Sequence, residues 1–300
     1  EEEIYSPTWT LGEISPFGQL KSSKIHALLN DKQGNLWLGL YMRGLFMIPK
    51  STYGFRPVNL YANNDSANGG VCVTSILRSQ NGELWVGSDG GGLYLISGNN
   101  KILNFSKHNS QLTNNSIMAM VEDKRGTIWI ATYLGGLYTL AAGQKQIVPY
   151  SKLHDMKLSC LAYDKLQDIL YVGSLGNGVK AISLSTNEII SITEEDTPFW
   201  TFTLYLNGVG DLWMGTAYGL YYYDNAIKKM QEINMPKREL KTQINACCQR
   251  GDTLWVGTNR GLIRYDVKNG QGKRYTRSDG LPCDVIETLQ KTPAGDVWIG

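Results

Sequence analysis

The chain has 300 residues, of which 42% are hydrophobic and 19% charged, and its formal net charge is +2 at pH 7. This composition is globular, and so small a net charge argues against nucleic acid or an anionic membrane surface as a partner. No apolar run approaches the roughly 18 residues that span a bilayer, and the sequence begins without an initiator Met or a signal-peptide core. Both ends look cut from a longer protein.

Glycine and tyrosine are abundant, with 33 and 17 residues, and this favours strands joined by tight turns. The five cysteines have neither zinc-site nor disulfide spacing. Adjacent residues of a strand point to opposite faces, so Cys247 and Cys248 are not expected to form a bridge. We expect all five to be small buried thiols.

A short pattern of apolar residues, one aromatic and glycines returns seven times along the chain. The aromatic residues are 42 to 48 residues apart, and no helical pattern lies between them. A period in the low forties without helices is typical of a propeller, in which each repeat forms one four-stranded sheet. The seven aromatic positions are Trp37, Trp85, Trp129, Tyr171, Trp213, Trp255 and Trp298.

Each repeat can be divided into four strands. An apolar first strand, such as 24–30 or 116–123, precedes a polar turn that carries Gly three residues before the aromatic in most repeats. The second strand holds the aromatic, the third follows the next glycine, and a weaker fourth strand is expected at segments such as 57–61 and 272–276. The second strand is apolar on both faces, so we expect each aromatic to be buried between two neighbouring sheets.

Two glycine positions frame the connection between the second and third strands. We expect the first set to end the second strand and the second set to open the third, with a variable loop between them. The first set is Gly39, Gly87, Gly173, Gly215 and Gly257, and the second is Gly44, Gly92, Gly136, Gly178, Gly219 and Gly261.

The unit D-x-x-G-x-[LI]-W-[VIL]-G-[TS]-x-x-G-G-L-Y resembles the two-component regulator propeller repeat. The likeness is clearest at residues 31–46 and 123–138, and it extends from about Lys24 to Gly300. The fourth repeat departs most, because its segment DKLQDILYVG lacks both the turn Gly and the Trp. That sheet is the least secure of the seven.

The resemblance implies an extracytoplasmic sensor domain of a hybrid two-component system. It also implies a periplasmic ectodomain of an inner-membrane protein, with a kinase outside this chain and an oligosaccharide as the ligand. A homodimer through a larger ectodomain is a further expectation. The fold expected is an all-β, seven-bladed β-propeller over residues 25–300, with six complete four-stranded blades and a partial seventh at the C-terminus. Residues 1–24 form an N-terminal lead-in, and its segment 5–14 can donate a strand that closes the ring.

If the first strand of each blade lines the axis, the loops between second and third strands share one rim with the loops that enter each first strand. Aromatic, amide, carboxylate and guanidinium side chains at that rim suit the apolar faces and hydroxyls of sugars. The expected ligand-binding residues are Tyr41, Arg43, Asp89, His108, Tyr133, Asn177, Trp200, Tyr218, Asn259, Arg260 and Asp279.

Other chemistries find weaker support. Asp31 and Asp123 overlap the Asp-box of sialidase-like propellers, but a hairpin carboxylate that accepts turn N–H bonds explains them better. The acidic run 194–196 is interpreted as a solvated loop rather than a glycosidase pair. The three histidines have neither metal nor catalytic-triad spacing. We expect no metal, no cofactor and no catalysis by this domain.

Two other functions stay open. The chain could be a non-catalytic platform that binds a partner protein or a second copy through its rim or side. It could also be a carbohydrate-active enzyme with a propeller fold, although this is the weaker alternative.

Overall fold

The computed structural model describes residues 25–30, 36–40, 44–48, 60, 72–97, 101–193, 199–235, 240–291 and 296–300, the first three segments by their backbone alone. The chain divides into two compact units, the first within residues 7–59 and the second containing Leu60–Gly300. The first unit holds strands β1 (Ile25–Asn30), β2 (Leu36–Leu40) and β3 (Gly44–Ile48), which pair in that order into an antiparallel sheet. Residues 1–24 and the expected fourth strand at 57–61 lie outside the described segments, apart from Leu60.

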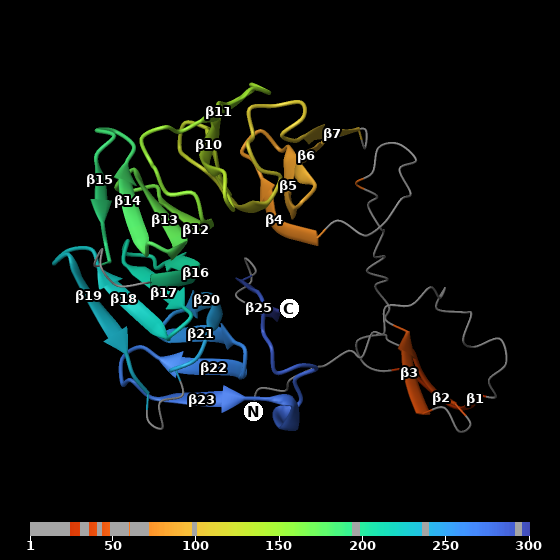
Figure 1. Ribbon diagram of the computed structural model, residues 1–300. Helices are drawn as coiled ribbons and strands as arrows, with labels where there is room; N and C mark the ends of the chain where they lie inside the picture. Colours follow the sequence, from red (N-terminus) through yellow and green to blue (C-terminus); the bar gives the residue numbers. More distant parts are fainter. Residues whose placement is uncertain are drawn as a thin grey trace. The chain divides into compact units, whose positions relative to one another are not determined.

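Among its described residues, the second unit contains five antiparallel groups of four consecutive strands and one two-stranded pair (Figure 1). A short strand pairing joins the third and fourth of these groups into one eight-stranded sheet. Their bounds follow in chain order: β4 (Cys72–Arg78), β5 (Leu84–Asp89), β6 (Gly92–Ile96) and β7 (Ile102–Phe105); β8 (Ile117–Glu122), β9 (Ile128–Thr132), β10 (Gly136–Leu140) and β11 (Ile147–Pro149); β12 (Leu158–Asp164), β13 (Ile169–Gly176), β14 (Val179–Ser183) and β15 (Ile189–Ser191); β16 (Phe199–Leu206), β17 (Leu212–Thr216), β18 (Leu220–Asp224) and β19 (Lys229–Ile233); β20 (Ile244–Arg250), β21 (Thr253–Thr258), β22 (Gly261–Asp266) and β23 (Gly272–Tyr275); β24 (Leu289–Lys291) and β25 (Val297–Ile299).

The first strands of these sheets lie side by side in chain order. β4 contacts β8, β8 contacts β12, β12 contacts β16, β16 contacts β20 and β20 contacts β24. In Figure 1 the sheets of this unit follow one another with their first strands on the inner side and their fourth strands on the outer side. The all-β, propeller-like stacking expected from the repeat is therefore confirmed, and the number of blades stays a prediction.

Most of the repeated aromatics are buried between sheets, as predicted. Trp85, Trp129, Tyr171 and Trp213 are each at most 6% exposed and belong to apolar clusters. Trp298 is different, because 69% of its surface is exposed on the β24–β25 pair. The prediction of burial is therefore wrong for Trp298, and Trp255 is only partly buried. The side chain of Trp37 lies outside what the structure describes.

We expected the glycine that follows most of these aromatics to end the second strand. It lies inside that strand instead. A Cβ on Gly215 would sit 2.5 Å from Thr203 Cγ2 and 2.7 Å from Ile244 Cγ2, and Ile244 begins the first strand of the next sheet. A Cβ on Gly87 would likewise sit 2.7 Å from Ile117 Cγ2. These glycines lack a side chain because the next sheet packs against their backbone.

The turn between first and second strands is a hairpin, as predicted. Its glycine has positive φ at Gly82, Gly126 and Gly210, a conformation that costs glycine little. In the divergent fourth repeat, Asp168 takes this position with φ of 57°, and the sheet β12–β15 forms all four strands. Asp and Asn tolerate the left-handed region better than other non-glycine residues, so the fourth repeat folds without the glycine.

The cysteines are buried only in part. Cys160, Cys247 and Cys248 are buried, whereas Cys72 and Cys283 are exposed, which corrects the expectation for those two. Cys247 and Cys248 belong to different apolar clusters on opposite faces of β20, as predicted. Burial raises the pKa of the Cys160 thiol to about 12, so this group stays protonated at neutral pH.

Candidate functional site

Two sets of loops meet at one edge of the second unit, which we call the rim. The first strand of each sheet pairs antiparallel with the second, so its first residues lie opposite the last residues of the second strand: Cys72 opposite Asp89 and Ile117 opposite Thr132. The loop that leads into each first strand (the inbound loop) therefore lies beside the turn between second and third strands (the rim turn). The shared rim expected from the sequence is present.

Backbone hydrogen bonds join each rim turn to the inbound loop of its own sheet. In four sheets an N–H from the rim turn is accepted by the carbonyl of the residue just before the first strand or, for β16, by that of its second residue. The pairs are Tyr133 N to Ser116 O (2.9 Å), Leu175 N to Lys157 O (2.9 Å), Ala217 N to Trp200 O (3.0 Å) and Asn259 N to Gln243 O (3.3 Å).

Further backbone bonds tie a rim turn to the inbound loop of the next sheet. Three of the glycines that open the third strand donate this bond: Gly92 N to Asn115 O (2.9 Å), Gly178 N to Phe199 O (3.0 Å) and Gly261 N to Asp284 O (2.5 Å). Main-chain atoms therefore join the rim across three of the interfaces between neighbouring sheets.

A buried hydroxyl closes every described rim turn of the second unit. It belongs to the Ser or Thr three residues after the repeated aromatic, and each donates to the carbonyl of the glycine that opens the third strand. These residues are at most 2% exposed. Their hydrogen bond explains why the repeat has Ser or Thr at this position, and the sequence alone does not reveal that bond. The bonds are Ser88 to Gly92 (2.8 Å), Thr132 to Gly136 (2.8 Å), Ser174 to Gly178 (3.1 Å), Thr216 to Gly219 (2.9 Å) and Thr258 to Gly261 (2.7 Å).

With the backbone and these hydroxyls holding the turns, the intervening side chains are free to face solvent. The predicted residues fall into three groups along the rim. In the middle group, Trp200 is 45% exposed and pairs with Leu175 near the end of β13, two residues before Asn177. The Trp200 carbonyl accepts a hydrogen bond from the rim turn that carries Tyr218, which is 58% exposed. An indole, a phenol and an exposed amide therefore come from two adjacent sheets to one place.

Asp89 and Tyr133 form a second group through a shared neighbour. Ser116 donates its hydroxyl to Asp89 Oδ1 (2.5 Å), and its carbonyl accepts the Tyr133 N–H. His108 is exposed on the same inbound loop, where its backbone N–H bonds Ser106 Oγ (3.3 Å). No bond between the His108 ring and Asp89 or Tyr133 is present among the described residues.

The third group comprises Asn259 and Arg260 on one rim turn, with Asp279 on the inbound loop that follows the same sheet. Thr242 Oγ1 bonds Asn259 Oδ1 (2.5 Å), and Arg260 is exposed beside it. Asp279 belongs to the short 3₁₀ helix η2 (Arg277–Asp279), which follows β23. Hydrogen bonds from the Thr276 backbone and hydroxyl lower the pKa of Asp279 below its ordinary value, so it is ionised at neutral pH.

The remaining predicted rim residues, Tyr41 and Arg43, lie outside the described segments, as do Asp31 and the acidic run 194–196. Three rim residues escaped the sequence analysis: Ser116, Lys157 and Gln243, the residues just before β8, β12 and β20. Their carbonyls bond a rim turn as that of Trp200 does from the second residue of β16, and only their constant position before the first strand could have pointed to them.

The edge opposite the rim uses its polar side chains internally. Asp123 is 2% exposed, and it accepts the backbone N–H groups of Arg125 (2.8 Å) and Thr127 (3.0 Å) and the indole N–H of Trp129 (3.0 Å). The interpretation of Asp123 as a hairpin carboxylate is therefore confirmed. Tyr221, Tyr222 and Tyr223 lie on β18, where Tyr221 packs on Phe199 and Tyr222 on Trp213, in the packing role expected for them.

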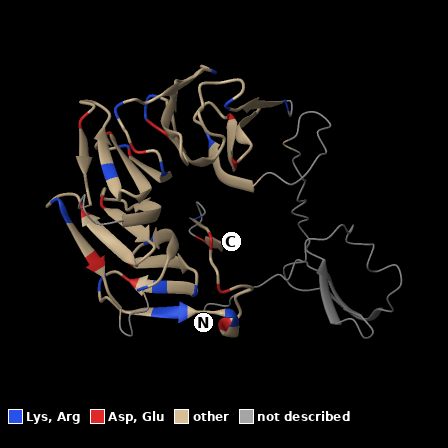
Figure 2. Cartoon of the chain, viewed as in Figure 1, with Lys and Arg blue, Asp and Glu red and all other residues tan. Residues whose placement is uncertain are grey.

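Lys, Arg, Asp and Glu are interspersed over the described strands (Figure 2). Within the described segments, no group of three or more His, Cys, Asp or Glu side chains is placed to hold a metal ion. The same residues include no helix with the length and apolarity needed to cross a membrane.

Comparisons with known proteins agree with this fold. Residues 19–41 and 111–134 match a family model described as two component regulator propeller, which confirms the resemblance found in the repeat. No curated protein sequence matches the chain.

Among solved structures, the extracellular domain of a putative hybrid two component system from B. thetaiotaomicron superposes with a TM-score of 0.52 at 18% identity, over 91% of this chain and 43% of its own. The present chain thus spans less than half of that structure. A catalytically inactive virginiamycin B lyase from Staphylococcus aureus with quinupristin (TM-score 0.59, 13% identity, 93% and 92% covered) and a streptogramin B lyase (TM-score 0.62, 12% identity, 92% and 89% covered) are also similar. At these identities the likeness concerns the fold alone.

Proposed function

We propose that this chain, which carries repeats of the two-component regulator propeller family, is the extracytoplasmic ligand-sensing domain of a hybrid two-component system. It binds an oligosaccharide at the rim and signals to a kinase outside these residues. The domain itself is non-catalytic, and its location is the periplasm. The observation that carries the proposal is the rim, where main-chain bonds fix five turns and leave their side chains exposed.

The middle group is the strongest part of this surface. Trp200 and Tyr218 expose large aromatic area, and Asn177 is exposed on the neighbouring turn. Aromatic rings pack against the C–H faces of pyranose rings, and amide and guanidinium groups bond the hydroxyls. The three groups together offer two phenols, an indole, two amides, a guanidinium and two carboxylates, so an oligosaccharide of several units can engage more than one group.

Signal transfer follows from the way in which the rim is tied together. Bonds such as Gly178 N to Phe199 O join adjacent sheets at the rim. A ligand that bridges two groups binds better when those sheets have one relative position, and so it shifts the population toward that position. A larger ectodomain, and a homodimer formed through it, would convey the shift to the kinase.

The test is calorimetric titration of the chain against soluble digests of a panel of polysaccharides. We expect one digest to bind the wild type, and the double variant Trp200→Ala/Tyr218→Ala to lose at least tenfold in affinity. Lys145→Ala is the matched control, because Lys145 is exposed on the β10–β11 turn, at the opposite edge. Its affinity is expected to equal that of the wild type.

Two outcomes contradict the proposal. If no digest binds while the chain forms a defined dimer in solution, a protein-interaction platform is the better interpretation. Release of shortened sugars during the same incubation would instead indicate a carbohydrate-active enzyme. The lyase structures with a similar fold are those of enzymes.

A further inference from the structure

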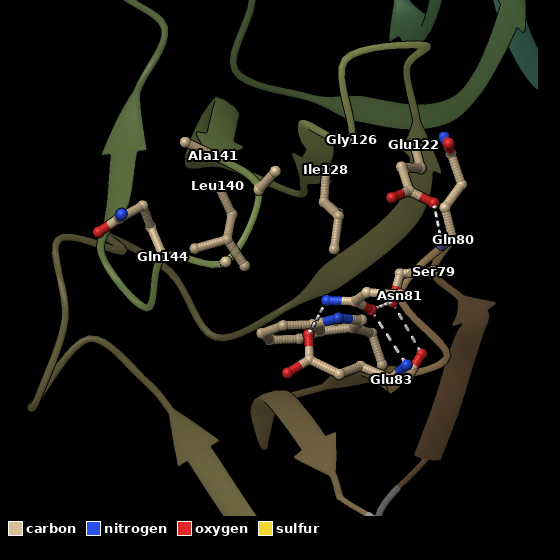
Figure 3. A pocket seen from close by; sticks show the side chains of 13 residues that line it. Ser79, Gln80, Asn81, Glu83, Glu122, Gly126, Ile128, Leu140, Ala141 and Gln144 are labelled. Carbon is tan, nitrogen blue, oxygen red and sulfur yellow. Dashed lines mark hydrogen bonds between the residues drawn. The ribbon is translucent and has the colours of Figure 1, made fainter.

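A cavity of about 130 Å³ lies between the sheets β4–β7 and β8–β11, at the edge opposite the rim. Three turns surround it, namely residues 79–83, the β8–β9 hairpin and residues 141–144. Figure 3 shows Asn81 and Glu83 from one sheet and Glu122, Ile128 and Leu140 from the next around this space. Its wall is apolar on one side and carries carboxylates and amides on the other.

The corresponding space in the next interface, between β8–β11 and β12–β15, is filled by this chain's own cations. Arg125 Nη2 lies 2.6 Å from Asp168 Oδ2, Arg125 Nη1 lies 3.7 Å from Asp123 Oδ2, and Lys124 Nζ lies 3.2 Å from Asp168 Oδ2. The Tyr163 hydroxyl bonds Asp168 (2.8 Å) and accepts the Lys124 backbone N–H (3.2 Å). A guanidinium between carboxylates is therefore part of how these sheets join.

Both cations are missing from the same repeat positions in the first interface. Counted from the repeated aromatic, Lys124 corresponds to Gln80 and Arg125 to Asn81, while Gly126 stands where the next repeat has Asp168. Strand pairing places Glu122 where the next sheet has Tyr163. Glu122 Oε2 accepts the Gln80 backbone N–H (2.7 Å), as Tyr163 accepts that of Lys124. These substitutions open the cavity and remove both cations; the carboxylate of Asp168 is lost at Gly126, and Glu122 brings another at a different position.

The carboxylates that line the cavity have no cationic partner. No Lys or Arg belongs to its wall, and among the described residues neither Glu83 nor Glu122 forms an ion pair. Glu83 Oε2 accepts only the Asn81 amide (2.9 Å), an exposed bond that a stronger donor can replace. Charge-assisted bonds from guanidinium to carboxylate are about twice as strong as neutral ones.

An independent observation concerns Trp85, which also lines the cavity. Trp85 is 1% exposed, and its Nε1–H is buried without a hydrogen-bond partner. In the next interface the equivalent Trp129 N–H bonds Asp123 (3.0 Å). A buried unpaired donor is costly, so a ligand that supplies an acceptor as well as a cation suits this wall.

We propose that this cavity binds arginine, free or within a peptide, in the place that Arg125 occupies one interface further on. The guanidinium lies between the carboxylates of Glu83 and Glu122, the aliphatic stem packs on Ile128 and Leu140, and the main-chain carbonyl oxygen accepts the Trp85 N–H. This site is separate from the rim, so it adds a second ligand class to the proposed function and does not depend on it.

The test is titration of the whole chain with N-acetyl-L-arginine amide, followed by heteronuclear NMR at the tryptophan N–H resonances. We expect binding that shifts the Trp85 resonance, about fivefold weaker binding of agmatine, which keeps the guanidinium but lacks the carbonyl, and no binding of N-acetyl-L-citrulline amide, the neutral isostere. Free arginine and a Gly-Arg-Gly peptide separate the two sources, and tighter binding of either supports the site.

Variants locate the site within the chain. Glu122→Gln keeps the acceptor for the Gln80 N–H but removes the charge, and it is expected to weaken arginine binding at least tenfold; Asn81→Arg supplies the cation internally and abolishes it. Glu188→Gln, an exposed glutamate on another sheet, is expected to change nothing. Equal binding of the citrulline and arginine probes, unchanged affinity in Glu122→Gln, or no binding of any probe would overturn the proposal.

Discussion

The two edges of the sheet unit hold their loops in opposite ways. At the rim, main-chain bonds and buried hydroxyls such as Thr258 fix each turn, and large side chains such as Tyr218 stay exposed. At the opposite edge side chains themselves hold the structure, since Trp129 bonds Asp123 within one hairpin and Arg125 bonds Asp168 across two sheets. The rim can therefore change its side chains without loss of structure, whereas the opposite edge cannot.

Under the proposed function, this difference places ligand binding and stability at separate edges. A surface whose turns are fixed by backbone atoms can specialise for a ligand through its side chains. A surface whose carboxylates bond indole and backbone groups loses structure when those carboxylates change. The cavity beside Trp85 is the exception on the second edge, and there the internal cations are missing.

The largest effect is expected where sheet packs on sheet. Gly215→Ala places a Cβ within 2.7 Å of two side-chain carbons, and overpacking of this kind costs about 2–3 kcal/mol of the free energy of unfolding. Gly208→Ala is the control, because nothing lies within 4 Å of its Cβ position. Urea denaturation measures both, and equal stability of the two variants would refute the close approach between sheets.

A smaller loss is expected for Asp168→Asn at the opposite edge. Burial raises the pKa of Asp168, but hydrogen bonds from Tyr163, Lys124 and Arg125 outweigh burial and hold that pKa below its ordinary value. Asn keeps the left-handed turn but loses the charge, which costs about 1–2 kcal/mol at pH 7, since both cations are half exposed.

The same group gives this variant a pH signature. A carboxyl with a lowered folded pKa stabilises the fold above its unfolded pKa of about 3.9, and this contribution is lost as pH falls through the folded value. The difference in free energy of unfolding between wild type and Asp168→Asn should therefore shrink below about pH 4. A difference that stays constant from pH 7 to pH 3 would show that the charge is not responsible.

At the rim the buried hydroxyl is expected to matter next. Thr258→Val removes the bond to the Gly261 carbonyl (2.7 Å) and the acceptor of the Arg260 N–H (2.9 Å), at a cost of about 1 kcal/mol. Thr253→Val on the same strand is the control, because its hydroxyl makes no bond within the described segments. Thermal denaturation of both separates the hydroxyl from the shape of the side chain.

Exposed rim side chains should have the smallest effect on stability. Tyr218→Ala removes a ring that is 58% exposed, and substitutions at such positions usually change stability by less than about 0.5 kcal/mol. A loss near that of Thr258→Val would mean that Tyr218 packs and is not free for a ligand. The melting temperature of Tyr218→Ala distinguishes these two outcomes.

The sequence predicts the fold well because the repeated pattern reflects how the sheets must pack. A strand apolar on both faces, as at Leu84, Trp85 and Val86, requires a sheet on either side, and its return seven times requires stacking. The role of the glycine after the aromatic was misjudged, since the close approach of Ile244 to Gly215 depends on the distance between sheets. Trp298 lies on the last of the described sheets. That sheet has a described neighbour on one side only, so the indole is not buried between two sheets.

The candidate site is predictable only in part. The spacing of the repeats places Tyr218 and Arg260 on rim turns, but the grouping of Trp200 with Tyr218 rests on one backbone bond from Ala217 N–H to the Trp200 carbonyl. Lys157 and Gln243 carry no residue type that distinguishes them from other loop residues. The cavity appears only when four repeat positions are compared between adjacent interfaces, because its cause is the absence of side chains.

The most direct test of this separation measures binding and stability together in one pair of variants. For Tyr218→Ala at the rim and Asp168→Asn at the opposite edge, the melting temperature and the calorimetric affinity for the active polysaccharide digest are determined. The account predicts a normal melting temperature with lost affinity for Tyr218→Ala, and a lowered melting temperature with normal affinity for Asp168→Asn. Loss of affinity in Asp168→Asn together with full affinity in Tyr218→Ala would contradict it.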